Sequence, residues 1–453
     1  MADLFIRNID TIVTCDDRDQ VLHNADLAIE GGVITGMGPV GTVARPPLAR
    51  EIMGDGLWLY PGLVNTHHHL YQYFTRNLPQ VQNMELFDWL TALYGIWKGL
   101  DEEMVYLSAL CGMGELVKYG CTTCFDHHYV FPQGQSRLID AQLQAAEQLG
   151  IRMHASRGSM SLSQKDGGLP PDSVVQELDA ILQDSRRLIE AYHDARPFSM
   201  RQIVLAPCSP FSVTADLLRE SAVLARSYQV RLHTHLCETK DEERFTLEKT
   251  GMRPYDYMES LGWTGPDVWY AHGIHFNDNE LLRLAQSQTG VAHCPCSNMK
   301  LASGVCRVPD LLRLGVPLGL AVDGSASNDG SNLLEELRTA YLLHRLTYGE
   351  QAPTGYQLLK VATRGGAKLL GRDDIGQVAT GKAGDVFLID SRSLELTGAL
   401  QDPASFFGTV GYHAPAKYTV IAGKVVAQEG VLVGIEEESI RQAANAAVKR
   451  LLR

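Results

Sequence analysis

The sequence predicts an α/β protein: a (β/α)8 TIM-like barrel with a small β-sandwich domain formed from both ends of the chain. The length of 453 residues is about three times that of a usual domain, which allows one large barrel and a smaller companion. Strand-like runs around glycine turns occupy both ends, and apolar strands alternate with amphipathic helices between them. We expect the sandwich to comprise residues 1–60 and 375–435, the barrel residues 61–372, and a C-terminal docking helix residues 436–453.

The two ends of the chain share a pattern of short strands. Residues 4–6, 11–14 and 27–29 are strand-like, and Gly31-Gly32 supplies a hairpin turn into the next strand. The same alternation returns in residues 385–389 and 418–427. Two β segments at opposite ends predict one small sheet domain closed by both termini.

The middle of the chain repeats an apolar strand followed by an amphipathic helix. Helical patterns such as residues 102–118, 173–192 and 331–346 separate the strands, as a parallel barrel requires. The eight predicted strands are residues 63–65, 121–125, 151–154, 203–206, 230–234, 268–271, 291–294 and 318–322.

Composition and charge exclude several classes of protein. The chain has 40 basic and 53 acidic side chains, a formal charge of −13, with no basic cluster, which argues against a nucleic-acid partner. No apolar run approaches the ~20 residues of a membrane span, and residues 1–4 lack the features of a signal peptide, so we expect a cytoplasmic protein without a membrane partner. Nine scattered cysteines predict reduced thiols.

Several histidines stand where a predicted strand ends, which is where barrel enzymes carry their active sites. His67 and His69 point to one side of their strand and His68 to the other, because side chains alternate. The fifth, sixth and eighth strands end in similar residues, and Glu238 follows the fifth. Three imidazoles and one carboxylate suit a zinc ion with one position left for water. The candidates on those strands are His233, His235, His272 and Asp323.

Other polar residues admit more than one interpretation. His233 is either a site residue or a hydrogen-bonded support, and His68 is expected to be a bystander. Cys121 and Cys124, with the Cys294-Pro-Cys296 segment, suggest a structural zinc site or a redox pair, but strand alternation sends the first two thiols to opposite faces. The Asp126-His127-His128 segment and Arg157 either line the mouth of the barrel or are merely solvated there.

At these residues the sequence resembles the amidohydrolase superfamily, and the resemblance covers nearly all of the chain. The matching segments are residues 61–69 (PGLVNTHHH), 233–238 (HTHLCE), 271–273 (AHG), 294–301 (CPCSNMKL) and 322–328 (VDGSASN). The resemblance implies that the metal ligands are His67, His69, His235 and Asp323, and that Glu238, His272 and Asp323 are catalytic.

Within the superfamily, the sequence is similar to the mononuclear aminohydrolases that deaminate nucleobases and s-triazines. Binuclear members usually carry a strand-four lysine, and residues 205–210 have none, so one Zn²⁺ per chain is implied, with Fe²⁺ as an alternative. Residues 67–72, 85–90, 157–162 and 167–172 look most like the bacterial 8-oxoguanine deaminases. Cys208 stands near the place where guanine deaminases tend to carry an arginine.

The resemblance implies hydrolytic deamination of a small free heterocycle. Zinc lowers the pKa of a bound water from about 16 to about 7, and Glu238 suits protonation of a ring nitrogen and then of the leaving amine. The expected reaction converts 8-oxoguanine to urate and ammonia. The alternatives are an s-triazine amino- or chlorohydrolase, a deaminase of guanine, a pterin or another base, and a metal-stabilised binding scaffold without activity. Substrate contacts are expected from Gln72, Trp89, Arg157 and Cys208, and a homo-oligomer is a family-level expectation.

Overall fold

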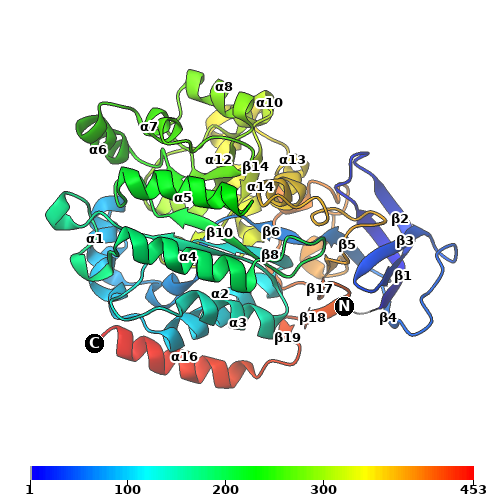
Figure 1. Ribbon diagram of the computed structural model, residues 1–453. Coiled ribbons are helices and arrows are strands. Elements are labelled where there is room, and N and C mark those ends of the chain that lie inside the picture. The colour runs from blue at the N-terminus through cyan, green and yellow to red at the C-terminus, as the bar shows by residue number, and fades with distance from the viewer. Residues whose placement is uncertain (1–2) are drawn as a thin grey trace.

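The structure, a computed structural model, describes residues 3–453, so the first two residues of the predicted sandwich domain lie outside the described residues. A barrel and a separate sheet lie side by side (Figure 1). In the described chain the barrel sheet has eight strands, all parallel. They are β6 (Leu63–Asn65), β8 (Cys121–Asp126), β9 (Arg152–Ser159), β10 (Arg201–Pro207), β11 (Arg231–Leu236), β12 (Val268–His272), β13 (Gly290–His293) and β14 (Leu318–Leu320).

The barrel closes through the residues that follow its first and last strands. The backbone N–H of Thr66 donates to the carbonyl of Leu320 at 3.3 Å. Just beyond, β7 (His68–His69) pairs in parallel with β15 (Asp323–Gly324). The predicted barrel is therefore confirmed, and its closure brings the first and eighth strand ends together where metal ligands were expected.

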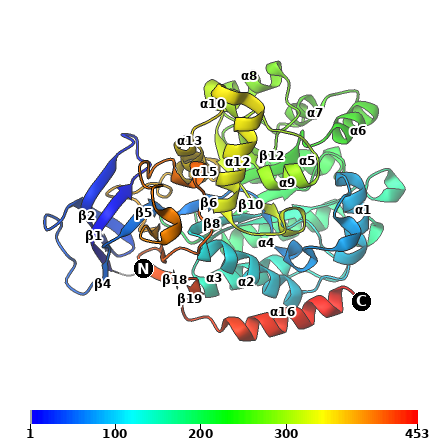
Figure 2. The same cartoon turned by 180° about the vertical axis from the view of Figure 1, so that it is seen from behind.

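Helices cover the outside of the barrel (Figures 1 and 2). The predicted helix 102–118 matches α2, whose first turn is capped by Asp101, the Oδ1 of which accepts from the N–H of Met104 at 2.7 Å. The helices up to the last barrel strand are α1 (Leu86–Trp97), α2 (Glu102–Lys118), α3 (Leu138–Leu149), α4 (Leu178–Tyr192), α5 (Ala215–Ser227), α6 (Lys240–Thr250), α7 (Pro254–Ser260), α8 (Asp278–Ser287), α9 (Pro295–Lys300) and α10 (Val308–Leu314). Those that follow are α11 (Ser325–Asn328), α12 (Leu333–Tyr348), α13 (Gly355–Lys360), α14 (Gly366–Leu369), α15 (Phe406–Thr409) and α16 (Glu437–Leu451).

The separate sheet is built from both ends of the chain. Strand β5, from the N-terminal part, pairs antiparallel with β16, from the C-terminal part, and an apolar core that includes Leu59 and Leu388 fills its interior. The strands are β1 (Leu4–Val13), β2 (Val21–Glu30), β3 (Val33–Pro39), β4 (Arg50–Met53), β5 (Leu57–Pro61), β16 (Val386–Asp390), β17 (Tyr418–Ile421), β18 (Lys424–Gln428) and β19 (Val431–Leu432). This sheet, formed by both ends of the chain beside the barrel, confirms the second part of the predicted fold class.

A buried ion pair joins the sheet to the barrel. The guanidinium of Arg152, on β9, donates to both carboxylate oxygens of Asp385, at 2.5 Å and 3.0 Å. Asp385 also accepts from the backbone N–H of Ala422 at 2.8 Å. Since both groups are buried away from water, each charge is offset by the charge of its partner. The pair fixes the C-terminal strands against the bottom of the barrel.

The last helix, α16, lies along α2 in both views (Figures 1 and 2). It buries Ala444, Ala447 and Leu451 on one face. Acidic residues occupy its first turn and basic residues its last, which suits the helix dipole. No helix in residues 3–453 is both long enough and apolar enough to cross a membrane.

Candidate active site and metal centre

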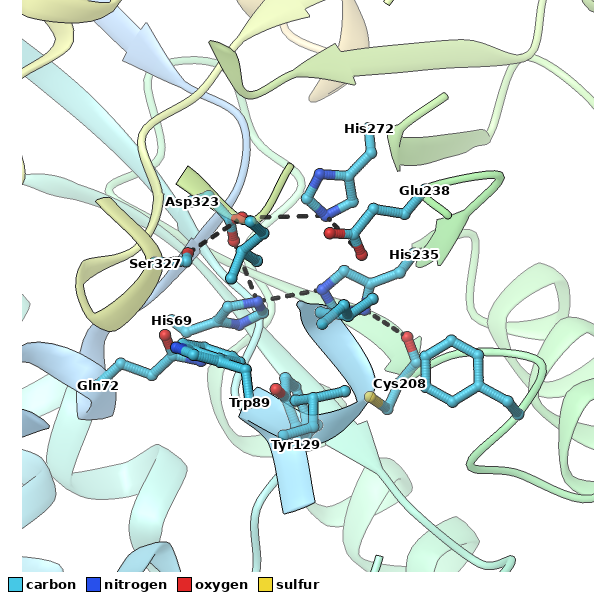
Figure 3. Close-up of a pocket in the computed structure, with 14 residues that line it drawn as sticks. His69, Gln72, Trp89, Tyr129, Cys208, His235, Glu238, His272, Asp323 and Ser327 are labelled. Carbon is cyan, nitrogen blue, oxygen red and sulfur yellow. Dashed lines mark hydrogen bonds and ion pairs between the residues drawn. The ribbon is translucent and has the colours of Figure 1, made fainter. Parts of the chain in front are cut away.

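A cavity opens at the carboxyl ends of the barrel strands (Figure 3). Its polar side chains come from strand ends around the barrel, and its apolar walls come largely from α1 and from loops above the barrel. The lining residues are His69, Gln72, Leu86, Trp89, Leu90, Tyr129, Cys208, Phe211, His235, Glu238, His272, Leu301, Asp323 and Ser327.

Three imidazoles and one carboxylate converge at the floor of this cavity. The Oδ1 atom of Asp323 lies 3.2 Å from Nε2 of His67 and 3.3 Å from Nε2 of His69. The Nε2 atoms of His69 and His235 are 3.1 Å apart. The structure thus brings together the four residues that the sequence predicted as metal ligands.

Hydrogen bonds on the far side of each ring fix its tautomer. The Nδ1 of His69 donates to the carbonyl of His127 at 2.7 Å, and the Nδ1 of His235 donates to that of Cys208 at 2.6 Å, because a carbonyl can only accept. His233 donates from Nδ1 to the carbonyl of Trp269 at 2.9 Å, so its Nε2 accepts from Nδ1 of His67 at 2.8 Å. All three Nε2 lone pairs therefore face the centre, and His233 is a hydrogen-bonded support.

The donor set fits a divalent metal. Burial lowers the pKa values of His67, His69 and His235, which keeps the rings neutral as metal ligation requires. Burial alone would raise the pKa of Asp323, but the adjacent imidazole of His67 and the charge of His272 hold it well below its usual value. The buried Nε2 of His67 has no hydrogen-bond partner among the described residues. Nitrogen donors with one carboxylate favour zinc among the common divalent ions.

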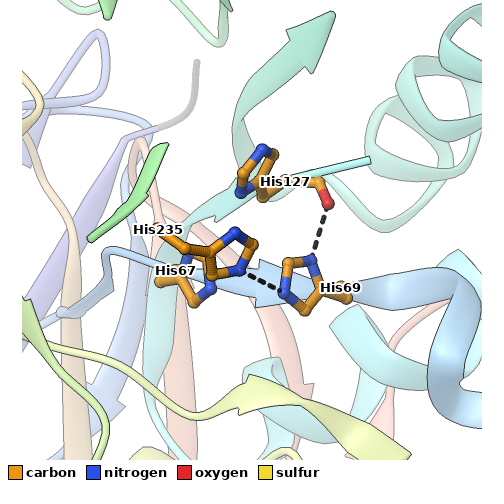
Figure 4. Close-up of side chains that lie close together, drawn as sticks. All are labelled: His67, His69, His127 and His235. Carbon is orange, nitrogen blue, oxygen red and sulfur yellow. Dashed lines mark hydrogen bonds between the residues drawn. The ribbon is translucent and has the colours of Figure 1, made fainter. Parts of the chain in front are cut away.

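A fourth imidazole, that of His127, stands beside the three and was not singled out from the sequence (Figure 4). Its ring stacks on that of His235, with centroids 4.7 Å apart. Its Nε2 donates to the carbonyl of Ala206 at 2.8 Å. The neighbouring His128 instead bonds the carbonyl of Val130 and the amide of Gln142. Strand alternation at the end of β8 was the available signal for choosing His127 over His128.

Glu238 and His272 form the wall above the donors. The Nε2 of His272 lies 3.5 Å from Oε2 of Glu238 and 3.9 Å from Oδ2 of Asp323. Burial raises the pKa of Glu238, whereas His272 opposes that rise. Burial would lower the pKa of His272, but the two carboxylates outweigh it and raise that pKa. The Nδ1 of His272 bonds Oδ1 of Asn298 at 2.9 Å, which orients the ring.

The backbone is strained where these side chains are presented. Cys237, His272 and Asp323 have φ values of 55°, 71° and 62°, in the left-handed region that residues other than glycine rarely adopt. Glu242 accepts from the N–H groups of Cys237 and Glu238, both at 2.9 Å, and so holds the first of these turns. These turns set the directions in which the neighbouring side chains project into the site.

The predicted substrate contacts divide into two groups. Gln72, Trp89 and Cys208 line the cavity, and both Oε1 of Gln72 and Nε1 of Trp89 are buried there without a hydrogen-bond partner among the described residues. Arg157 does not reach the cavity. Its guanidinium donates to Asp184 at 2.6 Å and stacks on Phe131.

The remaining candidates have structural partners. His68 bonds the hydroxyl of Ser331 at 3.0 Å and points away from the donors, as strand alternation predicts. All nine cysteines are free, so the predicted reduced thiols are consistent with the structure. No Lys or Arg appears among the residues that line the cavity in the described chain.

Comparison with known proteins adds three findings. The family model described as "Amidohydrolase family" matches residues 58–426. The chain is 48% identical over 405 residues to the 8-oxoguanine deaminase of Pseudomonas aeruginosa, covering 89% of each chain, and 40% identical over 454 residues to the hydroxydechloroatrazine ethylaminohydrolase of Pseudomonas sp. (strain ADP), covering 97% and 94%. The zinc complex of the atrazine chlorohydrolase from Arthrobacter aurescens TC1 superimposes with a TM-score of 0.94 at 32% identity, covering 98% of this chain and 100% of that one.

Proposed function

The chain belongs to the amidohydrolase family, and from that premise we propose that it deaminates a free purine base, 8-oxoguanine, to urate and ammonia. The sequence resemblance to this family is thereby confirmed. The comparisons also support a hydrolase that acts on C–N bonds, because the similar proteins include deaminases and an aminohydrolase.

The position of the Glu238 carboxyl group carries the proposal. It is buried at 3% exposure beside His272 and above the cluster of three imidazoles and Asp323. Deamination of a ring carbon needs a proton on the neighbouring ring nitrogen and later one on the leaving amine. A carboxyl group whose pKa is raised by burial holds such a proton at a higher pH than an exposed one.

Each residue of the site has a proposed part in the reaction. The carboxylate of Asp323, which its low pKa keeps ionised, lines the cavity and is available to receive a proton from the attacking water. His272 orients that water through Nε2 and stabilises the charge that develops as the water attacks the ring carbon. Glu238 protonates the ring nitrogen through its carboxyl oxygen. The proton that Asp323 took from the water then passes through the ionised Glu238 carboxylate to the departing amine, and the new hydroxyl group returns a proton to Glu238 as ammonia leaves.

His67, His69, His235 and Asp323 would hold the metal, and we propose one ion per chain. A bound zinc ion supplies a water that loses its proton near pH 7. The zinc complex of the structural neighbour supports zinc as the ion, and Fe²⁺ is the alternative that imidazole and carboxylate donors also accept.

The rest of the cavity fits a flat, neutral, polar ring. Gln72 and Trp89 offer an unpartnered acceptor and an unpartnered donor, which match an N–H group beside a ring carbonyl. Leu86, Leu90 and Phe211 supply apolar surface for the ring face. Cys208 covers a further edge without adding charge. We also propose that the protein acts on small molecules and that it forms a homo-oligomer.

A second function is favoured by the 40% identity to an s-triazine aminohydrolase. The same proton transfers would serve there, and only the ring would differ. The experiment is ammonia release from 8-oxoguanine, guanine, isoguanine, a pterin and a hydroxylated s-triazine, measured on zinc-loaded protein. We expect the highest kcat/KM for 8-oxoguanine. A triazine turned over a hundredfold better than any purine would assign the protein to the second function. If no compound is turned over, the alternative of a metal-stabilised binding scaffold without activity is supported.

A further inference from the structure

The amide of Gln72 lies directly against the backbone of Gly324. A Cβ atom placed on Gly324 would stand 1.9 Å from Oε1 of Gln72 and 2.5 Å from its Cδ. Such distances are far inside van der Waals contact, and the atoms concerned belong to a side chain that is itself 1% exposed. Glycine is therefore the residue that leaves Gln72 in its present position.

The backbone conformation of Gly324 does not itself require glycine. Its φ and ψ are −66° and 136°, an extended conformation that any residue adopts. The missing side chain, rather than backbone freedom, is thus what the site uses at this position. A substitution by alanine would change the space beside Gln72 with little effect on the path of the chain.

The segment that carries Gln72 is fixed at both ends, whereas its amide is not. In the 3-10 helix η1 (Leu70–Thr75), the N–H of Leu70 donates to Oδ1 of Asp126 at 2.6 Å, and the hydroxyl of Thr75 donates to the carbonyl of Gln72 at 3.0 Å. The Oε1 of Gln72 has no hydrogen-bond partner among the described residues. The amide therefore occupies space that the missing side chain of Gly324 leaves free, and no hydrogen bond to its Oε1 from the described residues holds it there.

The pairing of β7 with β15 explains why these two residues meet. Gly324 stands opposite His69, three residues before Gln72, in the short ladder that closes the barrel. The same ladder places Asp323 beside the imidazole donors. The β7–β15 ladder thus positions both the metal donors and the Gln72 amide at the edge of the cavity.

We propose that Gly324 is a specificity-determining residue. Because it has no side chain, the Gln72 amide lies where it can hydrogen-bond an amide-like edge of the heterocycle. The inference rests on the proposed function, because it assigns Gln72 to a purine edge. A side chain at position 324 would force the amide out of its seat and into the space that the ring occupies. The ring edge would then lose a partner inside a water-excluded cavity.

A double-mutant cycle tests this proposal. Gly324→Ala, Gln72→Ala, the double variant and the wild type are compared in kcat/KM for 8-oxoguanine and guanine, with the metal content of each protein measured. We expect each single change to lower kcat/KM for 8-oxoguanine by about 10- to 100-fold, the loss typical of an unmade buried hydrogen bond. The double variant should be no worse than Gln72→Ala and should show the same ratio between the two substrates, because the shortened side chain leaves room for the new methyl group.

The cycle separates the proposal from its competitors. If the losses in kcat/KM multiply in the double variant, the two positions act independently and the inference is overturned. It is also overturned if Gly324→Ala loses metal and this loss persists in the Gln72→Ala background, because position 324 then acts through Asp323. An unaltered kcat/KM in either single variant would also overturn it. If Gly324→Ala is too unstable to assay, melting temperatures of the four proteins give the same test, since Gln72→Ala should restore stability. Failure of the wild type on every purine would instead refute the proposed function.

Discussion

The Nε2 atom of His272 lies 3.5 Å from Oε2 of Glu238, so a buried imidazole and a buried carboxyl group share one wall of the cavity (Figure 3). The two groups shift each other in opposite directions: the carboxylate raises the pKa of His272, and the imidazole opposes the rise that burial causes in Glu238. A structural metal site needs neither of them. Their pairing is therefore the feature that separates an enzyme from a metal-stabilised scaffold.

Glu238→Gln is expected to lower kcat by roughly 10²–10⁴, the usual share of a positioned acid-base group, while the metal content stays unchanged. The amide fills the same space but cannot transfer a proton to a ring nitrogen. Steady-state ammonia release and elemental analysis measure the two quantities. Glu248→Gln, at an exposed position on α6, is the matched control. Near wild-type turnover in Glu238→Gln would remove this residue from the proton transfers.

Elemental analysis should find about one divalent ion per chain, because Asp323 and the imidazoles of His67, His69 and His235 meet at the floor of one cavity. His235→Asn should reduce the metal content, since it removes one of three neutral nitrogens that face the centre. His413→Asn, at an exposed histidine, should leave it unchanged. Two tightly held ions per chain in a fully active protein would contradict the single-ion proposal.

Stability should fall as the pH rises from about 5 to 8, because of Glu336. This carboxyl group on α12 is fully buried, and burial raises its pKa to about 8 from an ordinary 4.5. The folded state binds the proton more tightly than the unfolded state, so its contribution is complete below pH 4.5 and is lost as the pH passes 8. The loss is at most about 5 kcal/mol, since one bound proton changes the free energy of unfolding by about 1.4 kcal/mol per pH unit.

Denaturant unfolding of Glu336→Gln across this pH range measures the contribution. The slope should flatten in the variant and stay unchanged in Glu335→Gln, whose side chain is exposed on the same helix. Glu336 accepts from the N–H of Cys296 at 3.1 Å and from the amide of Asn328 at 2.6 Å, so the substitution would also weaken these contacts at every pH. An identical slope in wild type and variant would exclude Glu336 as the source.

The strands, and the convergence of imidazoles at the barrel mouth, could be predicted from the sequence for a physical reason. Alternation along a strand and the end of each apolar run are local properties, and they identify the side chains that face the barrel mouth, such as His67, His69 and His235. Arg157 also follows a predicted strand, but its partner Asp184 is 27 residues away on α4. The pairing of a buried guanidinium with a partly buried carboxylate across a strand and a helix has no local signal, so the sequence could not show that Arg157 is absent from the cavity lining.

The same limit applies to the contact between the Gln72 amide and Gly324. Nothing in residues 322–328 distinguishes a glycine kept for backbone freedom from one kept for space, and the difference depends on a side chain about 250 residues earlier in the chain. His127 differs from this case, because strand alternation at the end of β8 separates it from His128, although the stacking of its ring on His235 is visible only in the structure.

Removal of the C-terminal strands should destroy the solubility of the protein. A chain that ends at Gly371 loses β16 to β19, which leaves the edge of β5 unpaired and free to recruit other chains. It also removes Asp385, so the fully buried guanidinium of Arg152 keeps its charge without a partner, at a cost of about 3–5 kcal/mol. A chain that ends at Glu436 loses only α16 and is the control, because every strand and the Arg152–Asp385 pair remain. We expect the first truncation to be recovered as aggregate and the second to unfold cooperatively, as judged by gel filtration and thermal melting. A soluble, cooperative and active protein ending at Gly371 would show that the barrel folds without the sheet, and would refute the assignment of residues 375–435 to a domain shared with residues 1–60.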